Sequence, residues 1–290
     1  MRPLDMLRAL AVMAIWGFNF AVSKVTLEQL QPLTAMALRF ALVAAMLLPF
    51  VKVPRGQMRA LFYYSVVMGG LHFPLIFTGV KGVDASIASI AIQTQVPFAS
   101  ILAAVFLKDA LGWRRAVGMA VAFAGIVVIA GEPRASANLF SLFLVIAAAM
   151  AFAFSNIQLK WMGEIDPFTL NAYMAGFAVP QLVVLSALLE ENQIAQIMAA
   201  DWLGWACLGY MAAVSTIVAY WLWYPLVRRY QVNQTMPFLL LVPIFGVGSG
   251  VLVLGEPLTW HLLAGGALTL AGVAVVIVRR PKIIEARTTT

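Results

Sequence analysis

The chain is a succession of long apolar runs separated by short polar connections. Ten such runs lie at 7–25, 33–50, 59–80, 85–106, 113–131, 139–159, 168–189, 203–225, 235–254 and 259–278. Each run is close to the roughly 20 residues that a helix needs to cross the hydrocarbon of a bilayer. Backbone groups in lipid need hydrogen-bond partners within their own segment, and the alternating strands of a membrane barrel are not seen. The pattern predicts an all-α integral membrane protein with ten transmembrane helices.

Composition excludes several other classes of protein. Hydrophobic residues make up 63% of the 290 residues and charged residues only 11%, whereas a soluble domain is about half apolar and about a quarter charged. This excludes a water-soluble enzyme, a disordered chain and a nucleic-acid binder. The single cysteine, Cys207, cannot form an internal disulfide. The N-terminal run lacks a convincing cleavage site, so we expect an uncleaved first span and no signal peptide.

The distribution of positive charge predicts the orientation. If the N-terminus is cytoplasmic, 15 of the 19 Lys and Arg residues fall in cytoplasmic segments. The other four are Lys81 and Arg134 in outer loops, Lys24 near the outer end of the first span, and Arg39 within the second. Cytoplasmic loops of membrane proteins carry such an excess of Lys and Arg. Both termini are therefore expected in the cytoplasm, and the net charge of +7 needs no polyanionic partner.

The two halves of the chain share an ordered set of residues. At an offset of 147, Asp109, Leu111, Trp113, Gly118 and Gly125 recur as Glu256, Leu258, Trp260, Gly265 and Gly272. At an offset of 146, Tyr64 matches Tyr210 and Pro97 matches Pro243. We predict one five-helix repeat over residues 1–133 and a second over 134–290. An odd number of spans inverts the second repeat, an arrangement typical of transporters that hold substrate between their halves.

Several short motifs carry a resemblance to a known family. The first span contains Ala-Ile-Trp-Gly-Phe-Asn-Phe, Pro97 precedes Lys108-Asp109-Ala110-Leu111, and Pro243 precedes Gly255-Glu256-Pro257-Leu258. The chain resembles the drug/metabolite transporter superfamily of the EamA type, and within it the branch of aromatic amino acid exporters (YddG-like). The first half departs from the Gly-Glu pattern at Lys108-Asp109. The resemblance implies a multi-pass protein of the bacterial inner membrane that exports amino acids or other small metabolites by alternating access.

Polar and aromatic side chains within the spans are the candidate substrate-binding residues, because polar groups are costly in the membrane. They are Trp16, Asn19, Tyr64, Met68, His72, Gln93, Tyr210 and Tyr220. Tyr64, Met68 and His72 share one helical face. Together they predict an aromatic, Met-containing cavity with few charges, suited to a flat apolar solute. The alternative is close packing and hydrogen bonding between helices.

Glycine and proline residues inside three spans predict places where the helices bend. Gly69, Gly70, Pro97 and Pro243 are the candidate hinges, because proline removes a backbone hydrogen bond and kinks a helix. The alternative is a static kink that only shapes the bundle.

The charged residues favour a facilitator or exchanger. No carboxylate lies near the middle of a span, and Asp109, Glu164 and Glu256 at span ends are expected to cap helices or pair at the interface. His72 is the one candidate for a proton-coupling group. Arg39 could bind a substrate carboxylate, but the resemblance favours a structural role for it.

Other classes of function lack their usual residues. An intramembrane enzyme would need a catalytic constellation, and neither His-Glu-x-x-His nor Gly-x-Ser-x-Gly occurs. We expect no catalytic residues, no metal and no cofactor. The expected partners are a small-molecule substrate, an amino acid or related metabolite, and the lipid bilayer. Export of drugs or other metabolites stays an alternative, and the oligomeric state stays open.

Overall fold

The structure, a computed structural model, describes residues 1–108, 112–133, 138–230 and 232–278. Ten helical stretches of this described part are long and apolar enough to cross a membrane. The described residues form helices and short connections, with no β-strand among them. The predicted all-α membrane protein with ten spans is therefore confirmed.

Five spans come from the first half of the chain. They are α1 (Pro3–Gln29), α2 (Pro32–Leu47), α3–η2–α4 (Met58–Val67, Met68–His72, Phe73–Gly82), α5–η3–α6 (Ala85–Ala91, Ile92–Thr94, Gln95–Leu107) and α7 (Trp113–Ala130). A short 3₁₀ turn, η1 (Leu48–Phe50), follows α2. Pro3 and Pro32 stand at the first position of their helices, where the missing N–H is not needed.

Five further spans come from the second half. They are α9 (Leu139–Met162), α10 (Pro167–Leu189), α12–η4–α13 (Trp202–Gly209, Tyr210–Val218, Ala219–Arg229), η5–α15 (Met236–Leu241, Val242–Leu254) and α16 (Trp260–Val278). Two short helices, α11 (Gln193–Ala199) and α14 (Val232–Thr235), lie between spans. The sequence analysis did not predict α11, because its seven residues are too short to show a helical period.

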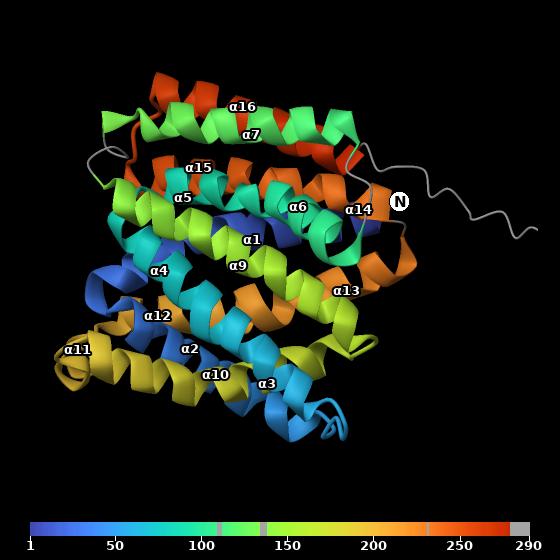
Figure 1. The fold of residues 1–290 in the computed structure, drawn as a ribbon. Coiled ribbons are helices and arrows are strands. Elements are labelled where there is room, and N and C mark those ends of the chain that lie inside the picture. The colour runs from blue at the N-terminus through green and yellow to red at the C-terminus, as the bar shows by residue number, and fades with distance from the viewer. Residues whose placement is uncertain (109–111, 134–137, 231, 279–290) are drawn as a thin grey trace, which may run out of the picture.

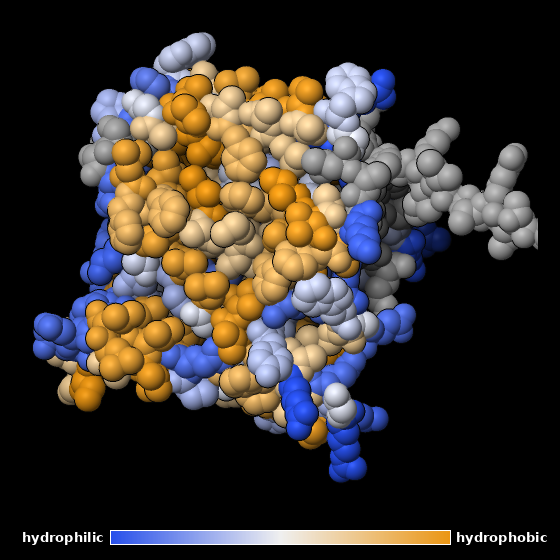
Figure 2. Space-filling view, viewed as in Figure 1, coloured by the Kyte–Doolittle hydropathy of each residue, from blue (hydrophilic) through white to orange (hydrophobic). Residues whose placement is uncertain are grey.

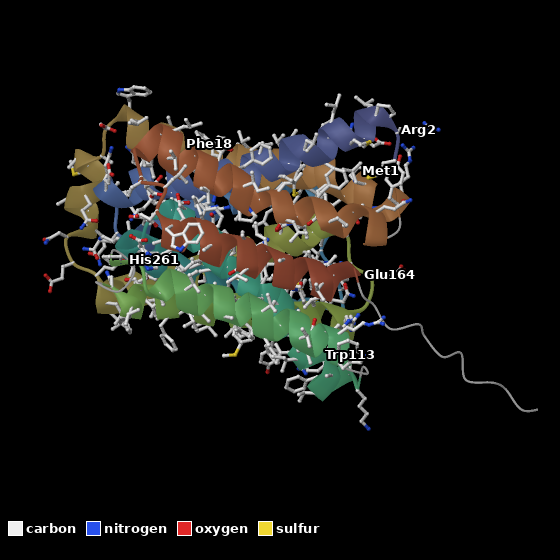
Figure 3. All side chains as sticks on the ribbon, turned by 90° about the horizontal axis from the view of Figure 1, so that it is seen from above. Met1, Arg2, Phe18, Trp113, Glu164 and His261 are labelled. Carbon is white, nitrogen blue, oxygen red and sulfur yellow. The ribbon has the colours of Figure 1, made fainter. Side chains whose placement is uncertain are left out.

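The helices stack in layers (Figure 1). α7 and α16 lie side by side at the top of that view, α5, α6 and α15 lie below them, and α2, α3 and α10 form the lowest layer. We call the end with the N-terminus and the loop 163–166 the terminal end, and the end with the loop 190–201 the distal end. Figure 3 shows Met1, Arg2, Trp113 and Glu164 at the terminal end and His261 toward the distal end.

Hydrophobic side chains cover the middle of the molecule, and hydrophilic ones gather mainly at its two ends (Figure 2). Phe50, Leu188, Leu252 and Val127 are among the large apolar side chains that the protein leaves exposed. An apolar belt between two polar ends is what a bilayer requires, because lipid replaces water around the middle of the bundle.

Close contacts between glycines hold α7 against α16. A Cβ added at Gly118 would meet the carbonyl oxygen of Gly272 at 2.9 Å, and one added at Gly125 would meet that of Gly265 at 2.5 Å. Small residues let membrane helices approach closely in this way. The two outer helices therefore form a tight pair.

Irregular turns interrupt four of the spans. The π-helical segments η2 and η4 lie in the third and eighth spans, and the 3₁₀ segments η3 and η5 lie in the fourth and ninth. η2 contains Gly69 and Gly70, η3 ends three residues before Pro97, and η5 ends two residues before Pro243. Such segments in a long helix often mark functional hinges.

Candidate functional site

A cavity of about 780 Å³ lies where the third, sixth, seventh and eighth spans meet. Its wall includes Gly163, Glu164, Ile165 and Asp166, so it reaches the terminal end at the loop between α9 and α10. Its inner wall includes Met68 and Phe152, each ten residues from the terminal end of its span. At a rise of 1.5 Å per residue, the cavity extends about 15 Å into the bundle.

Five of the fifteen residues that line this cavity are aromatic. Tyr220 and Tyr224 stack with ring centroids 5.1 Å apart, and Asn171 donates a hydrogen bond of 2.9 Å from Nδ2 to the Tyr224 hydroxyl. Tyr64 and Phe152 line it as well. Ligand pockets combine apolar walls with a few polar groups in this manner, and the arrangement suits a flat apolar solute with small polar groups.

Three of the residues singled out in the sequence line the cavity, namely Tyr64, Met68 and Tyr220. Tyr64 and Met68 come from the third span, and Tyr220 comes from the eighth. Trp16 packs against Tyr220, and the centroids of their rings are 5.5 Å apart. Its indole Nε1 donates to the carbonyl of Ser215 at 3.1 Å. Trp16 therefore supports the wall from the first span.

The other candidate residues lie outside the wall. The ring of His72 is 5.3 Å from that of Phe152, and its Nδ1 donates to the Ala148 carbonyl at 2.8 Å. The Tyr210 hydroxyl donates to the Ile15 carbonyl at 3.0 Å, and Gln93 Nε2 to the Leu239 carbonyl at 3.3 Å. Asn19 Nδ2 donates to Ser23 Oγ at 3.4 Å. The hydrogen bonds of His72, Tyr210 and Gln93 link different spans, whereas that of Asn19 lies within α1. Substrate binding by these four residues stays a prediction.

Sequence reasoning missed several lining residues. Phe152 and Asn156 come from α9, and Asn171 comes from α10; these two spans contributed no candidate. The amides of Asn156 and Asn171 were the available signal, since both interrupt apolar runs. Phe152 carried no signal, because a phenylalanine in an apolar span faces lipid or protein equally well.

The candidate hinge glycines make close contacts with a neighbouring helix. A Cβ at Gly69 would lie 2.4 Å from that of Ala178 in α10, and one at Gly70 would lie 2.5 Å from Gln181 Oε1. The absence of a side chain thus lets α10 approach η2. Pro97 and Pro243 are both buried. A hinge role for these four residues stays a prediction.

Buried carboxylates tie helices together at the distal end. Glu190, at the end of α10, accepts hydrogen bonds from the backbone N–H of Leu33 (2.7 Å) and of Thr34 (2.9 Å) at the start of α2. Glu256, after α15, accepts from the backbone N–H of Ala85 (2.6 Å) and of Ser86 (2.9 Å) at the start of α5. A carboxylate at a helix N-terminus satisfies free N–H groups and the helix dipole.

A third carboxylate at the same end contacts residues at the start of α16. Glu132, which follows α7, accepts a hydrogen bond from the Thr259 hydroxyl and lies 3.5 Å from His261 Nδ1. Each of the three carboxylates, Glu132, Glu190 and Glu256, joins a helix of one half of the chain to a helix of the other. Together they fasten the distal end.

Exposed polar groups also join helices at the distal end. Gln29 and Asp201 exchange two hydrogen bonds, of 2.8 and 2.9 Å, between the end of α1 and the start of α12. The hydrogen bond from the Gly204 backbone N–H, followed by that from Gln29, lowers the pKa of the Asp201 carboxyl. Asp201 is thus held in its charged form as a cap of α12.

At the terminal end, the carboxylates of Asp166 and Asp5 make contacts of a different kind. Asp166 caps its own helix, accepting from the Thr169 N–H at 2.8 Å. Asp5 joins α1 to α13, with Oδ2 2.7 Å from the Tyr230 hydroxyl and 3.5 Å from Arg229. Asp109, the counterpart of Glu256 in the first half, lies outside the described residues. In the part of the chain that the structure describes, no cluster of His, Cys, Asp and Glu could hold a metal ion.

Comparison with known proteins agrees with this architecture. The EamA-like transporter family matches residues 4–131 and again residues 139–278. A probable amino-acid metabolite efflux pump of Salmonella typhimurium is 33% identical over 92% of both chains. A protein of Escherichia coli with the same description is 30% identical over 93% of this chain and 94% of its own. One solved crystal structure, 15% identical, covers 95% of this chain with a TM-score of 0.61 and shares its fold.

Proposed function

Because the chain belongs to the EamA-like transporter family, we propose that it exports apolar or aromatic amino acids and related metabolites by alternating access. The observation that carries this proposal is the aromatic cavity, which reaches one end of the bundle and stops inside it. Relatives described as probable amino-acid metabolite efflux pumps support the substrate class. The protein is a multi-pass membrane transporter and not an enzyme.

Two contacts support an inverted repeat as the basis of the mechanism. Gly118 and Gly125 correspond to Gly265 and Gly272 at an offset of 147. The pairs in contact are Gly118 with Gly272 and Gly125 with Gly265. A twofold axis that exchanges the repeats converts one of these contacts into the other, as an isologous interface requires. Two such halves can open toward either side by similar motions.

The irregular turns support the same mechanism. The π-helical segments η2 and η4 occupy matching spans of the two repeats, and so do the 3₁₀ segments η3 and η5. The proposed motion bends these four spans, which closes the cavity at the terminal end and opens the distal end. In this reading the structure represents the state with the distal end closed.

The charge distribution supports an orientation for export. The terminal end holds the excess of Lys and Arg and would face the cytoplasm of a bacterium, with the protein in the inner membrane. Substrate then enters the cavity from the cytoplasm. Thiol reagents that cannot cross the membrane should label Arg55→Cys only from the cytoplasm and Glu191→Cys only from outside. Labelling of both from one side would contradict this orientation.

We further propose that the substrate gradient drives transport without a stoichiometric proton. The carboxylates of the described residues lie at or beyond the ends of the spans. A proton gradient imposed on proteoliposomes should not accumulate substrate against its own gradient. Uphill accumulation that disappears in His72→Ala would instead make His72 the coupling group.

The experiment that tests the function is flux from proteoliposomes loaded with a panel of amino acids, amines and sugars. We expect saturable flux of phenylalanine and other apolar amino acids. Tyr64→Ala, in the cavity wall, should raise the KM, whereas Tyr63→Ala on the exposed face of the same helix should not. Saturable flux of amines alone would favour drug export, and an absence of saturable flux would refute the proposal.

A further inference from the structure

Arg39 is a buried cation near the middle of the membrane. It lies seven residues after the start of α2, about 10 Å from the distal end at 1.5 Å per residue. Only 5% of the residue is exposed. A guanidinium stays charged at every physiological pH, and an isolated charge in an apolar environment is strongly unfavourable. Hydrogen bonds or opposite charges, from the protein or from a ligand, must therefore offset the cost of burying the Arg39 guanidinium.

The protein supplies only part of that compensation. Arg39 Nη2 donates one hydrogen bond of 3.0 Å to Thr216 Oγ1. The guanidinium carbon lies 5.4 to 5.9 Å from the ring centroids of Phe40, Phe73 and Phe77, where cation–π attraction acts. Its Nε is buried without a hydrogen-bond partner. A guanidinium has five N–H donors, so several stay available.

No anion of the described residues completes the site. Among the residues that the structure describes, no carboxylate lies within ion-pair distance of Arg39. The buried carboxylates of the distal end already accept hydrogen bonds. Glu190, for example, also accepts from the hydroxyls of Thr34 and Ser186, each at 2.8 Å. The described part of the chain therefore holds no counter-anion for Arg39, and a bound anionic ligand would supply one.

Arg39 adjoins the deep wall of the cavity. Phe152 lines the cavity and its ring contacts that of His72, which in turn lies 4.9 Å from the ring of Phe73 beneath the guanidinium. Tyr220 also lines the cavity and follows Thr216, the hydrogen-bond partner of Arg39, by four residues. The side chains of His72 and Phe73 therefore link the guanidinium to the deep wall of the cavity.

We propose that Arg39 binds the carboxylate of the transported amino acid at the deep end of this cavity, an inference that rests on the proposed function. A guanidinium binds a carboxylate through two parallel hydrogen bonds, and the free donors of Arg39 provide them once the side chains between Arg39 and the cavity move aside. The aromatic wall then holds the substrate side chain and its ammonium group. Arg39 selects substrates that carry a carboxylate.

The first experiment compares substrates with and without the carboxylate in proteoliposomes. The wild type should prefer phenylalanine to phenylalaninamide. In Arg39→Gln the KM for phenylalanine should rise about 10- to 100-fold, the usual effect of losing hydrogen bonds to a charged group, while the KM for the amide stays unchanged. Arg59→Gln, an exposed arginine at the terminal end, is the control and should alter neither.

The second experiment needs no variant, because Arg39→Gln could fail to fold. Phenylpropanoate has the carboxylate without the ammonium, and phenethylamine has the ammonium without the carboxylate. Phenylpropanoate should inhibit phenylalanine flux of the wild type, and phenethylamine should inhibit much less. Equal inhibition by both, or equal losses for phenylalanine and its amide in Arg39→Gln, would overturn the proposal. A wild type without saturable flux of any of these compounds would instead refute the proposed function.

Discussion

Removing the charge of Glu256 should open the distal end. Its carboxylate accepts hydrogen bonds from two backbone N–H groups at the start of α5 and from the Ser86 hydroxyl. Glu256→Gln keeps the shape and one acceptor oxygen, but loses the negative charge and the second acceptor. Caps of this kind typically stabilise by about 1 kcal/mol and at most by about 2 kcal/mol. In the proposed mechanism this contact exists only while the distal end is closed.

The lost free energy should therefore appear as a shift between the two states. A change of about 1–2 kcal/mol corresponds to about a 5- to 30-fold change in their ratio. A single cysteine in the cavity wall, Met68→Cys in a Cys207→Ala background, reports the accessible side. An impermeant maleimide should label it from the distal side about 5- to 30-fold faster in Glu256→Gln. Labelling from the terminal side should slow.

Two results decide the interpretation. Glu191→Gln, an exposed carboxylate at the same end, should leave both labelling rates as in the wild type. If Glu256→Gln lowers the unfolding temperature but leaves both rates unchanged, the carboxylate stabilises the fold alone. The proposed role of the distal carboxylates in gating would then be wrong.

Three further changes test other parts of the account. Pro97→Ala and Pro243→Ala should slow flux several-fold with little change in substrate affinity, because they act on the equilibrium between states; unchanged exchange rates in the double variant would make both prolines purely structural. Gly125→Ala should destabilise the protein by about 1–3 kcal/mol in thermal unfolding, because its Cβ would overlap the Gly265 carbonyl. Gly248→Ala is the control and should be neutral or stabilising, because a Cβ at Gly248 meets nothing within 4 Å. Lys108 has a φ of 56° at the end of α6, so Lys108→Gly should stabilise by about 1 kcal/mol, and a lower unfolding temperature would contradict this.

The spans could be predicted because their cause is local. An apolar run of sufficient length must become a helix in lipid, and the ten predicted runs match the ten helices to within a few residues at most ends. The helix α11 could not be predicted in this way. Its Ile194 and Met198 are 76% and 82% exposed, so no buried face left a pattern in the sequence.

The irregular turns were predictable only where a residue type demands them. Gly69, Gly70 and Pro74 mark η2, and Pro97 and Pro243 follow η3 and η5. By contrast, η4 contains neither glycine nor proline. Its conformation depends on packing against other spans, which a single sequence does not reveal.

Three of the candidate residues line the cavity, and their binding of substrate stays a prediction. Tyr64, Met68 and Tyr220 line the cavity, whereas His72 and Tyr210 are engaged by carbonyls of other spans. Periodicity assigns residues to a helical face, but it does not tell which face meets the cavity. The hydrogen bond between the Ala85 N–H and Glu256 could not be predicted either, because the two residues are 171 positions apart in the sequence.

Counterflow of phenylalanine tests the central claim most directly. Proteoliposomes are loaded with unlabelled phenylalanine at high concentration and diluted into a trace of labelled phenylalanine. An alternating-access carrier returns from the inner side with unlabelled substrate and should accumulate label transiently above its outside concentration. We predict this overshoot in the wild type. A monotonic approach to equal concentrations, at a rate that does not saturate, would contradict the account.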